Sequence, residues 1–162
     1  MKTKLITTIM LALFLSLLIA PAVSAQPRKP LRYEVSGESA TGWLGWVGTI
    51  DSGDLEGYTG IWVTLVLELR GGETLVDAKN VYFFELWFIG DGIDYVDGKV
   101  TGDVVLAGFD EGVTRLKNGK FSGNGRVTEA YGDWSGLIGC KEHCSGTVDF
   151  SDWTFTGTMQ IN

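Results

Sequence analysis

Short apolar runs separated by glycine are the feature of this chain that most restricts its fold. Glycine accounts for 23 of the 162 residues, and it falls between runs of apolar and β-branched residues. Turns at this density are typical of a meandering antiparallel sheet. Beyond residue 25 no stretch has a sustained helical period, so the sequence predicts an all-β fold.

The last run shows the strand pattern most clearly. Phe155, Met159 and Ile161 alternate with threonine and glutamine, which places the two sets on opposite faces of a strand. Residues 61–69 carry an equally unbroken apolar face, and we expect that strand at the centre of a sheet. Further strands are predicted over residues 31–36, 43–50, 81–89, 95–108, 113–116, 120–131 and 146–150.

Eight or nine short strands with no helix between them indicate antiparallel pairing. Closing such a sheet removes its unpaired edges, so we expect a small antiparallel β-barrel of eight or nine strands, with a two-sheet β-sandwich as the alternative. Asn118-Gly119 predicts a type I′ hairpin turn. Residues 31–162 are expected to form a single domain behind an extended, proline-containing leader at 26–30.

Residues 1–25 have the pattern of a helical secretory signal peptide. Lys2 and Lys4 precede an apolar stretch over 5–20, and small residues at 23–25 follow Pro21. Cleavage near Ala25 would give a secreted or cell-surface protein with no membrane segment, whereas an uncleaved anchor is the alternative.

The acidic balance of the remaining chain restricts its partners. After residue 25 there are 11 basic and 20 acidic residues, a net charge of −9. Such a chain is repelled by nucleic acid and by anionic membrane surfaces, so neither is expected as a partner. The sequence identifies no oligomer interface.

The chain from Asn118 onward carries a spaced-glycine pattern. Gly123, Gly125, Val127, Ala130 and Gly132 resemble the hairpin of the allene oxide cyclase and dirigent-like β-barrels. The resemblance covers about the last 45 residues and implies a small antiparallel barrel with a central cavity, secreted in the dirigent branch. None of the cyclase's catalytic residues align with this chain, so the family's activity is not carried over.

Glu85 is the carboxylate with the most apolar surroundings. It lies within 81–89, among eight apolar or aromatic neighbours, and a desolvated carboxyl has a raised pKa. A surface position on the outer face is the alternative. The residues expected to contact a ligand are Trp62, Tyr82, Glu85, Trp87 and Tyr131.

The chain has no recognisable catalytic set, and this favours a binding protein. We expect it to hold a small, largely apolar ligand in an aromatic-lined cavity, without a cofactor. One alternative is a cyclase or isomerase that uses Glu85 with Tyr82 or Tyr131 as a proton partner. Another is an extracellular interaction domain that presents exposed tryptophans to polysaccharide or protein.

Cys140 and Cys144 are the only cysteines. In an exported protein a lone pair is expected to form a disulfide, which here requires a tight turn between the two residues. A zinc or copper site built from Cys140, His143 and Cys144, with Glu142 or a distant residue as fourth ligand, is the alternative, but the spacing lacks the paired repeats of zinc motifs, so no metal is predicted. Acidic loops at 51–56 and 91–98 are expected to be solvated turns, with calcium binding as their alternative.

Overall fold

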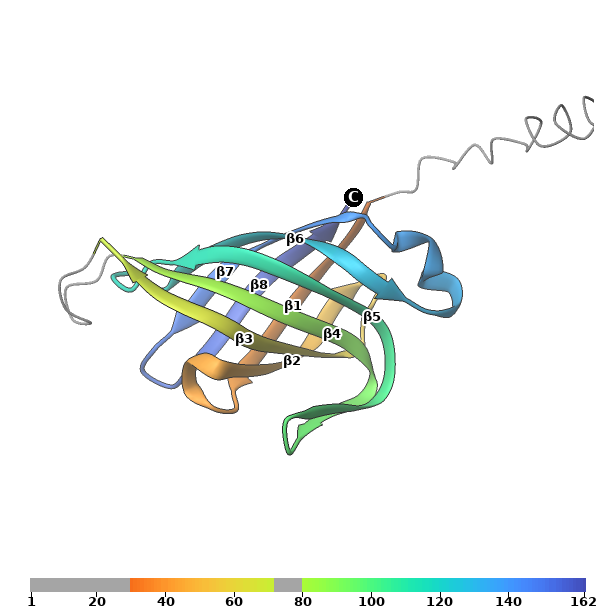
Figure 1. Ribbon diagram of the computed structural model, residues 1–162, viewed down its shortest axis with the longest axis horizontal. Coiled ribbons are helices and arrows are strands. Elements are labelled where there is room, and N and C mark those ends of the chain that lie inside the picture. Colours follow the sequence, from red (N-terminus) through yellow and green to blue (C-terminus); the bar gives the residue numbers. More distant parts are fainter. Residues whose placement is uncertain (1–29, 72–79) are drawn as a thin grey trace, which may run out of the picture.

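The protein is an eight-stranded antiparallel β-barrel (Figure 1). The computed structural model describes residues 30–71 and 80–162. Each strand pairs with the next along the chain, and β8 pairs with β1, which closes the barrel and confirms the barrel over the sandwich. The strands are β1 (Leu31–Ser39), β2 (Gly45–Gly53), β3 (Thr59–Arg70), β4 (Asn80–Val96), β5 (Lys99–Thr114), β6 (Lys120–Ala130), β7 (Lys141–Asp149) and β8 (Thr154–Ile161).

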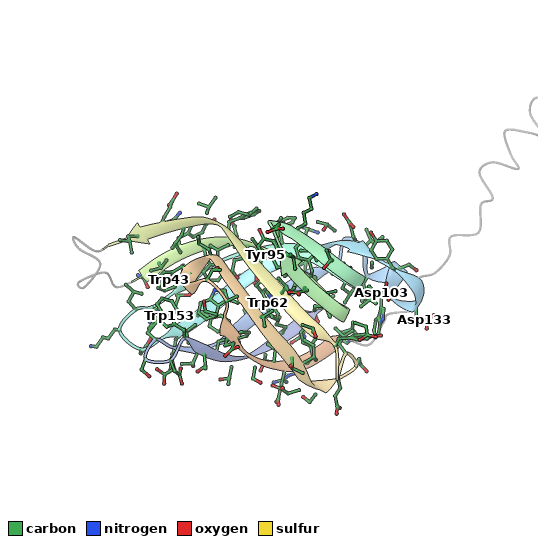
Figure 2. The ribbon with its side chains drawn as sticks, turned by 90° about the horizontal axis from the view of Figure 1, so that it is seen from below. Trp43, Trp62, Tyr95, Asp103, Asp133 and Trp153 are labelled. Carbon is green, nitrogen blue, oxygen red and sulfur yellow. The ribbon has the colours of Figure 1, made fainter. Side chains whose placement is uncertain are left out.

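Two short 3₁₀ helices mark the two ends of the barrel. The η1 helix (Gly42–Leu44) connects β1 to β2, and η2 (Gly132–Leu137) follows β6. We call these ends the η1 end and the η2 end. In Figure 2, Trp43 and Trp153 lie together at the η1 end, whereas Asp103 and Asp133 lie at the opposite end.

The predicted signal peptide, residues 1–25, lies outside the described residues, as do residues 26–29 of the leader. Across 30–71 and 80–162, no helix has the length and apolar character needed to cross a membrane.

Two hairpins differ from the sequence prediction. The predicted strand at 95–108 contains a turn at Asp97 and Gly98, which both have positive φ, as a two-residue type I′ loop requires. The predicted type I′ turn at Asn118-Gly119 is wrong, because only Gly119 has positive φ and the loop is longer, with Arg115 and Lys120 paired across it.

A β-bulge divides the face of β3 that looked continuous in the sequence. Thr64 pairs with Glu85, and Val66 pairs with Phe84, so two residues of β3 advance while β4 advances by one. The alternation of inward and outward side chains along β3 therefore shifts by one residue after Thr64. Trp62 and Thr64 therefore line the interior before the bulge, and Leu67 lines it afterwards. The single apolar face predicted over residues 61–69 is corrected accordingly.

Glycines on the inner wall make room for large aromatic rings. A Cβ atom added to Gly60 would overlap the Trp62 ring, and one added to Gly108 would overlap the Trp87 ring. Phe155 lies over glycines of β1 and β2, and Phe121 lies over glycines of β7 and β8, in the same way. A barrel this small accommodates so many rings because the wall opposite each ring has no side chain.

The two ends of the interior differ in their packing. The η2 end is filled by buried aliphatic side chains: Ile50, Leu55, Ile89, Leu106, Val127, Leu137 and Ile161. At the η1 end the aromatic rings of Trp43, Phe150 and Trp153 contact one another, with centroids 5.2 to 5.9 Å apart. The interior space between them is therefore bounded by aliphatic packing on one side and by rings on the other.

The contact between Gly60 and Trp62 provides a test of this packing. We expect Gly60→Ala to lower the free energy of unfolding by about 1–3 kcal/mol, because the added methyl group forces the buried indole to move. In the double variant Gly60→Ala/Trp62→Leu, the loss of stability should be clearly smaller than the sum of the losses in the two single variants, since leucine removes the overlap. Urea denaturation of the wild type, both single variants and the double variant measures this. Fully additive losses would contradict the packing.

Candidate functional site

Polar side chains form one continuous row around the middle of the barrel wall. Thr64 on β3 pairs with Glu85 on β4, which pairs with Asp110 on β5. Asp110 pairs with Gly125 on β6, and Gly125 pairs with Glu142 on β7. We call Thr64, Glu85, Asp110 and Glu142 the interior polar row. The pairing register therefore brings together three carboxyl groups that lie 25 and 32 residues apart in sequence.

An aromatic-lined cavity lies between this row and the η1 end. Its volume is about 50 Å³, several times the roughly 10–15 Å³ that one water needs. Thr64, Glu85, Asp110, Thr114 and Cys144 contribute its polar groups. The remaining lining residues are Trp43, Trp46, Trp62, Leu67, Phe83, Phe121, Val148, Phe155 and Met159.

Glu85 and Asp110 form a pair of enclosed carboxyls. The Thr64 hydroxyl donates a hydrogen bond of 2.6 Å to Glu85 Oε1, and the Cys144 thiol donates one of 3.2 Å to Asp110 Oδ2. Burial is the main cause that raises the pKa of each carboxyl, and the charge of Asp110 raises the pKa of Glu85 further. Both groups therefore favour the protonated, neutral form more than surface carboxyls do.

Glu142 is the most isolated member of the row. It is 2 % exposed, and neither of its carboxylate oxygens has a hydrogen-bond partner. Burial, with the charges of Asp110 and Glu85, raises the pKa of Glu142 to about 9. Next to it, Asp110 Oδ1 and the Tyr33 hydroxyl are also buried without a partner.

No positive charge offsets these carboxyls inside the described barrel. Every lysine, arginine and histidine within residues 30–71 and 80–162 is exposed. A buried carboxylate without a cation or sufficient hydrogen bonds is strongly disfavoured. The polar row is thus set up either to remain protonated or to receive a positively charged or hydrogen-bonding group.

The structure places the five residues predicted to bind ligand in three different environments. Trp62 and Glu85 line the cavity. Trp87 is 2 % exposed and lies against Gly108, on the η2 side of Glu85 and outside the cavity lining.

Tyr82 and Tyr131 are on the outer surface, away from Glu85. Their hydroxyls donate hydrogen bonds of 2.6 Å to Glu111 and to Glu129, both of which are exposed. The structure therefore does not bring either tyrosine to Glu85 as a proton partner. Tyr33, which the sequence did not single out, is the tyrosine that lies inside the barrel among the carboxyls.

The predicted disulfide between Cys140 and Cys144 is wrong, because both are free thiols. Residues from Lys141 onward belong to the extended strand β7, so no tight turn brings the two cysteines together. Cys144 points into the barrel, whereas Cys140 is half-buried and packs against the core between η2 and β7. His143 is exposed and contacts Asn124, so Cys140, His143 and Cys144 do not converge on one site either.

The acidic segments at 51–56 and 91–98 are solvent-exposed, with every aspartate and glutamate in them exposed. The prediction of turns is only partly correct, because residues 51–53 belong to β2 and residues 91–96 to β4.

Sequence reasoning missed Asp110 and Thr64, and it considered Glu142 only as a fourth ligand for a metal at Cys140, His143 and Cys144. A usable signal was present, because Asp110 alternates with Gly108 and Gly112, and Glu142 alternates with Cys144. Residues two positions apart along a strand face the same side. In a barrel whose inner wall is rich in glycine, a carboxylate two positions from such a glycine therefore faces the interior.

Comparison of the chain with protein-family models, curated proteins and solved structures gave no match.

The raised pKa of Glu142 predicts how the stability of the barrel depends on pH. The folded state keeps this proton up to about pH 9, whereas the unfolded chain releases it near 4.5. The free energy of unfolding should therefore fall as pH rises through this interval, by about 1 kcal/mol per pH unit for this group.

Glu142→Gln should make this pH dependence shallower. The matched substitution Glu111→Gln changes a carboxylate on the outer surface and should leave the slope unchanged. Urea denaturation between pH 5 and 9, in the presence of a chelator so that only protons occupy the carboxyls, measures both. A wild-type stability that stays constant or rises over this interval would refute the enclosure of Glu142.

Proposed function

We propose that the protein binds a small, largely apolar ligand inside the barrel, with one polar group of the ligand directed at Glu85 and Asp110. The observation that carries this proposal is the cavity, whose lining is mostly aromatic and aliphatic and whose two carboxyls, Glu85 and Asp110, are neighbours in the interior polar row. Ligand sites of this kind combine an apolar lining with a few placed polar groups.

The arrangement of the rings supports binding within the barrel over binding on its surface. Phe155 contacts both Trp46 and Trp62 edge to face, with ring centroids 5.7 and 5.5 Å apart. None of the six tryptophans is among the exposed side chains, and Trp43 and Trp153 meet at 88°. A flat, exposed platform for polysaccharide would require coplanar rings, so the interior is the better binding surface.

Small apolar probes test the proposal. We expect xenon and cyclopropane, which suit a cavity of about 50 Å³, to raise the melting temperature of the protein in a concentration-dependent way, because a ligand that binds only the folded state stabilises it. Val148→Phe introduces a ring into the cavity lining and should abolish this stabilisation. Thr147→Phe adds the same ring at the exposed neighbouring position and should preserve it.

Circular dichroism of both variants checks that the barrel is intact. If none of the probes stabilises the wild-type protein, or if Val148→Phe responds as strongly as wild type, binding within the cavity is refuted.

Export from the cytoplasm and kinship with the allene oxide cyclase and dirigent-like barrels are further parts of the proposal. The signal-like pattern of residues 1–25 supports export, and the glycine spacing of 123–132 supports the kinship. Amino-terminal sequencing of the protein from its own host should find a chain that begins near Gln26. An intact amino terminus in the cytosolic fraction would contradict export.

A further inference from the structure

Three potential metal ligands meet beside the cavity. Asp110, Glu142 and Cys144 each offer one ligand atom, and the three atoms lie within 4.8 Å of one another. We call these residues the acid–thiol cluster. All three are buried, at 1 %, 2 % and 2 % exposure. They come from β5 and β7, which are separated by β6, and the intervening residues Gly123 and Gly125 leave the space between them free of side chains.

Several buried polar atoms of the cluster have no hydrogen-bond partner within the described protein. Asp110 Oδ1 and both carboxylate oxygens of Glu142 are buried without a hydrogen-bond partner. The Tyr33 hydroxyl is likewise buried and unpartnered, and it lies close enough for the charges of all three cluster residues to raise its pKa. Native structures rarely leave so many buried polar atoms unpaired in one place.

The ligand set selects a class of ion. Two carboxylates and a phenol oxygen alone would suit Mg²⁺ or Ca²⁺, but the thiol adds a soft ligand that these hard ions do not use. Zn²⁺ accepts sulfur at about 2.3 Å and carboxylate oxygen at about 2.0–2.2 Å, so two of its ligands stand roughly 3.5 Å apart in a tetrahedron. The Cys144 Sγ to Asp110 Oδ2 distance is 3.2 Å, which is already close to this geometry.

We propose that Asp110, Glu142 and Cys144 form a binding site for a divalent zinc-type ion on the inner wall of the barrel, with Tyr33 beside it. Two of the ligands, Asp110 and Cys144, also line the cavity, so an ion reaches the site from the cavity side. The site does not depend on the apolar ligand proposed above.

Binding is an exchange of protons for metal. Bonds form from the ion to Cys144 Sγ and to one oxygen each of Asp110 and Glu142. The S–H bond and the carboxylic O–H bonds present in the metal-free protein break, and their protons pass to solvent. No electron is transferred, and the ion keeps its charge of +2.

Cobalt provides a spectroscopic test. Chelator-stripped, fully reduced protein titrated with Co²⁺ should show a near-ultraviolet thiolate-to-cobalt charge-transfer band that saturates at one ion per chain. Addition of Zn²⁺ should bleach this band. A wild-type protein that shows no thiolate band overturns the proposal.

The two cysteines form a matched pair for this measurement. Cys144→Ser should remove the charge-transfer band, whereas Cys140→Ser should keep it. Asp110→Asn should weaken Co²⁺ binding by at least about tenfold, since loss of a residue that only hydrogen-bonds to a metal ligand already costs that much affinity. Glu111→Gln, on the outer face next to Asp110, should leave the affinity unchanged. Loss of the band in Cys140→Ser, or its retention in Cys144→Ser, overturns the proposal.

X-ray absorption of the zinc-loaded wild-type protein keeps the test independent of the folding of any variant. One sulfur at about 2.3 Å with oxygen ligands at about 2.0–2.2 Å is expected. A shell without sulfur overturns the proposal. Either result leaves the probe-binding test of the proposed function unaffected when that test is run on chelator-treated protein, because its probes are neutral molecules.

Discussion

The packing of aromatic rings against glycines is the constraint on which the rest of this barrel depends. Eight strands enclose a narrow interior, and side chains of ordinary size on every inward position would overfill it. Alternating glycine with tryptophan or phenylalanine resolves this, because each ring occupies the space left by a glycine, as Trp87 does over Gly108. The high glycine content of the chain is therefore as much a property of its core as of its turns.

The same alternation explains how carboxyl groups come to be enclosed. Asp110 lies between Gly108 and Gly112 on the inner face of β5, and Gly125 separates it from Glu142 across the barrel wall. Bulky neighbours would have filled this region with apolar contacts. The missing side chains instead leave three carboxyls and a thiol facing one another with no basic residue of the described chain among them. Such a site costs stability at neutral pH, which is the usual mark of residues retained for binding.

The fold was predictable from the sequence to a large extent. Strict alternation in residues 153–161 identified β8, and the lack of any helical period identified the all-β class, since these patterns depend only on local geometry. Which residues of β3 face the interior was not predictable, because the bulge after Thr64 is set by pairing with β4. The sites depend even more on register: Glu85 was found from its apolar neighbours, but Asp110 and Glu142 have unremarkable neighbours in sequence. Likewise, the short spacing of Cys140 and Cys144 suggested a bridge that the extended strand rules out.

The barrel encloses carboxyl groups that have no positive partner among residues 30–71 and 80–162. Carbon-13 NMR of the side-chain carboxyls, recorded as a function of pH on metal-free protein, tests this enclosure. The resonance of Glu142 should titrate near pH 9, and those of Glu85 and Asp110 should titrate clearly above the surface carboxyls. Titration of every carboxyl near pH 4 would show that these groups are solvated and that the barrel does not enclose them.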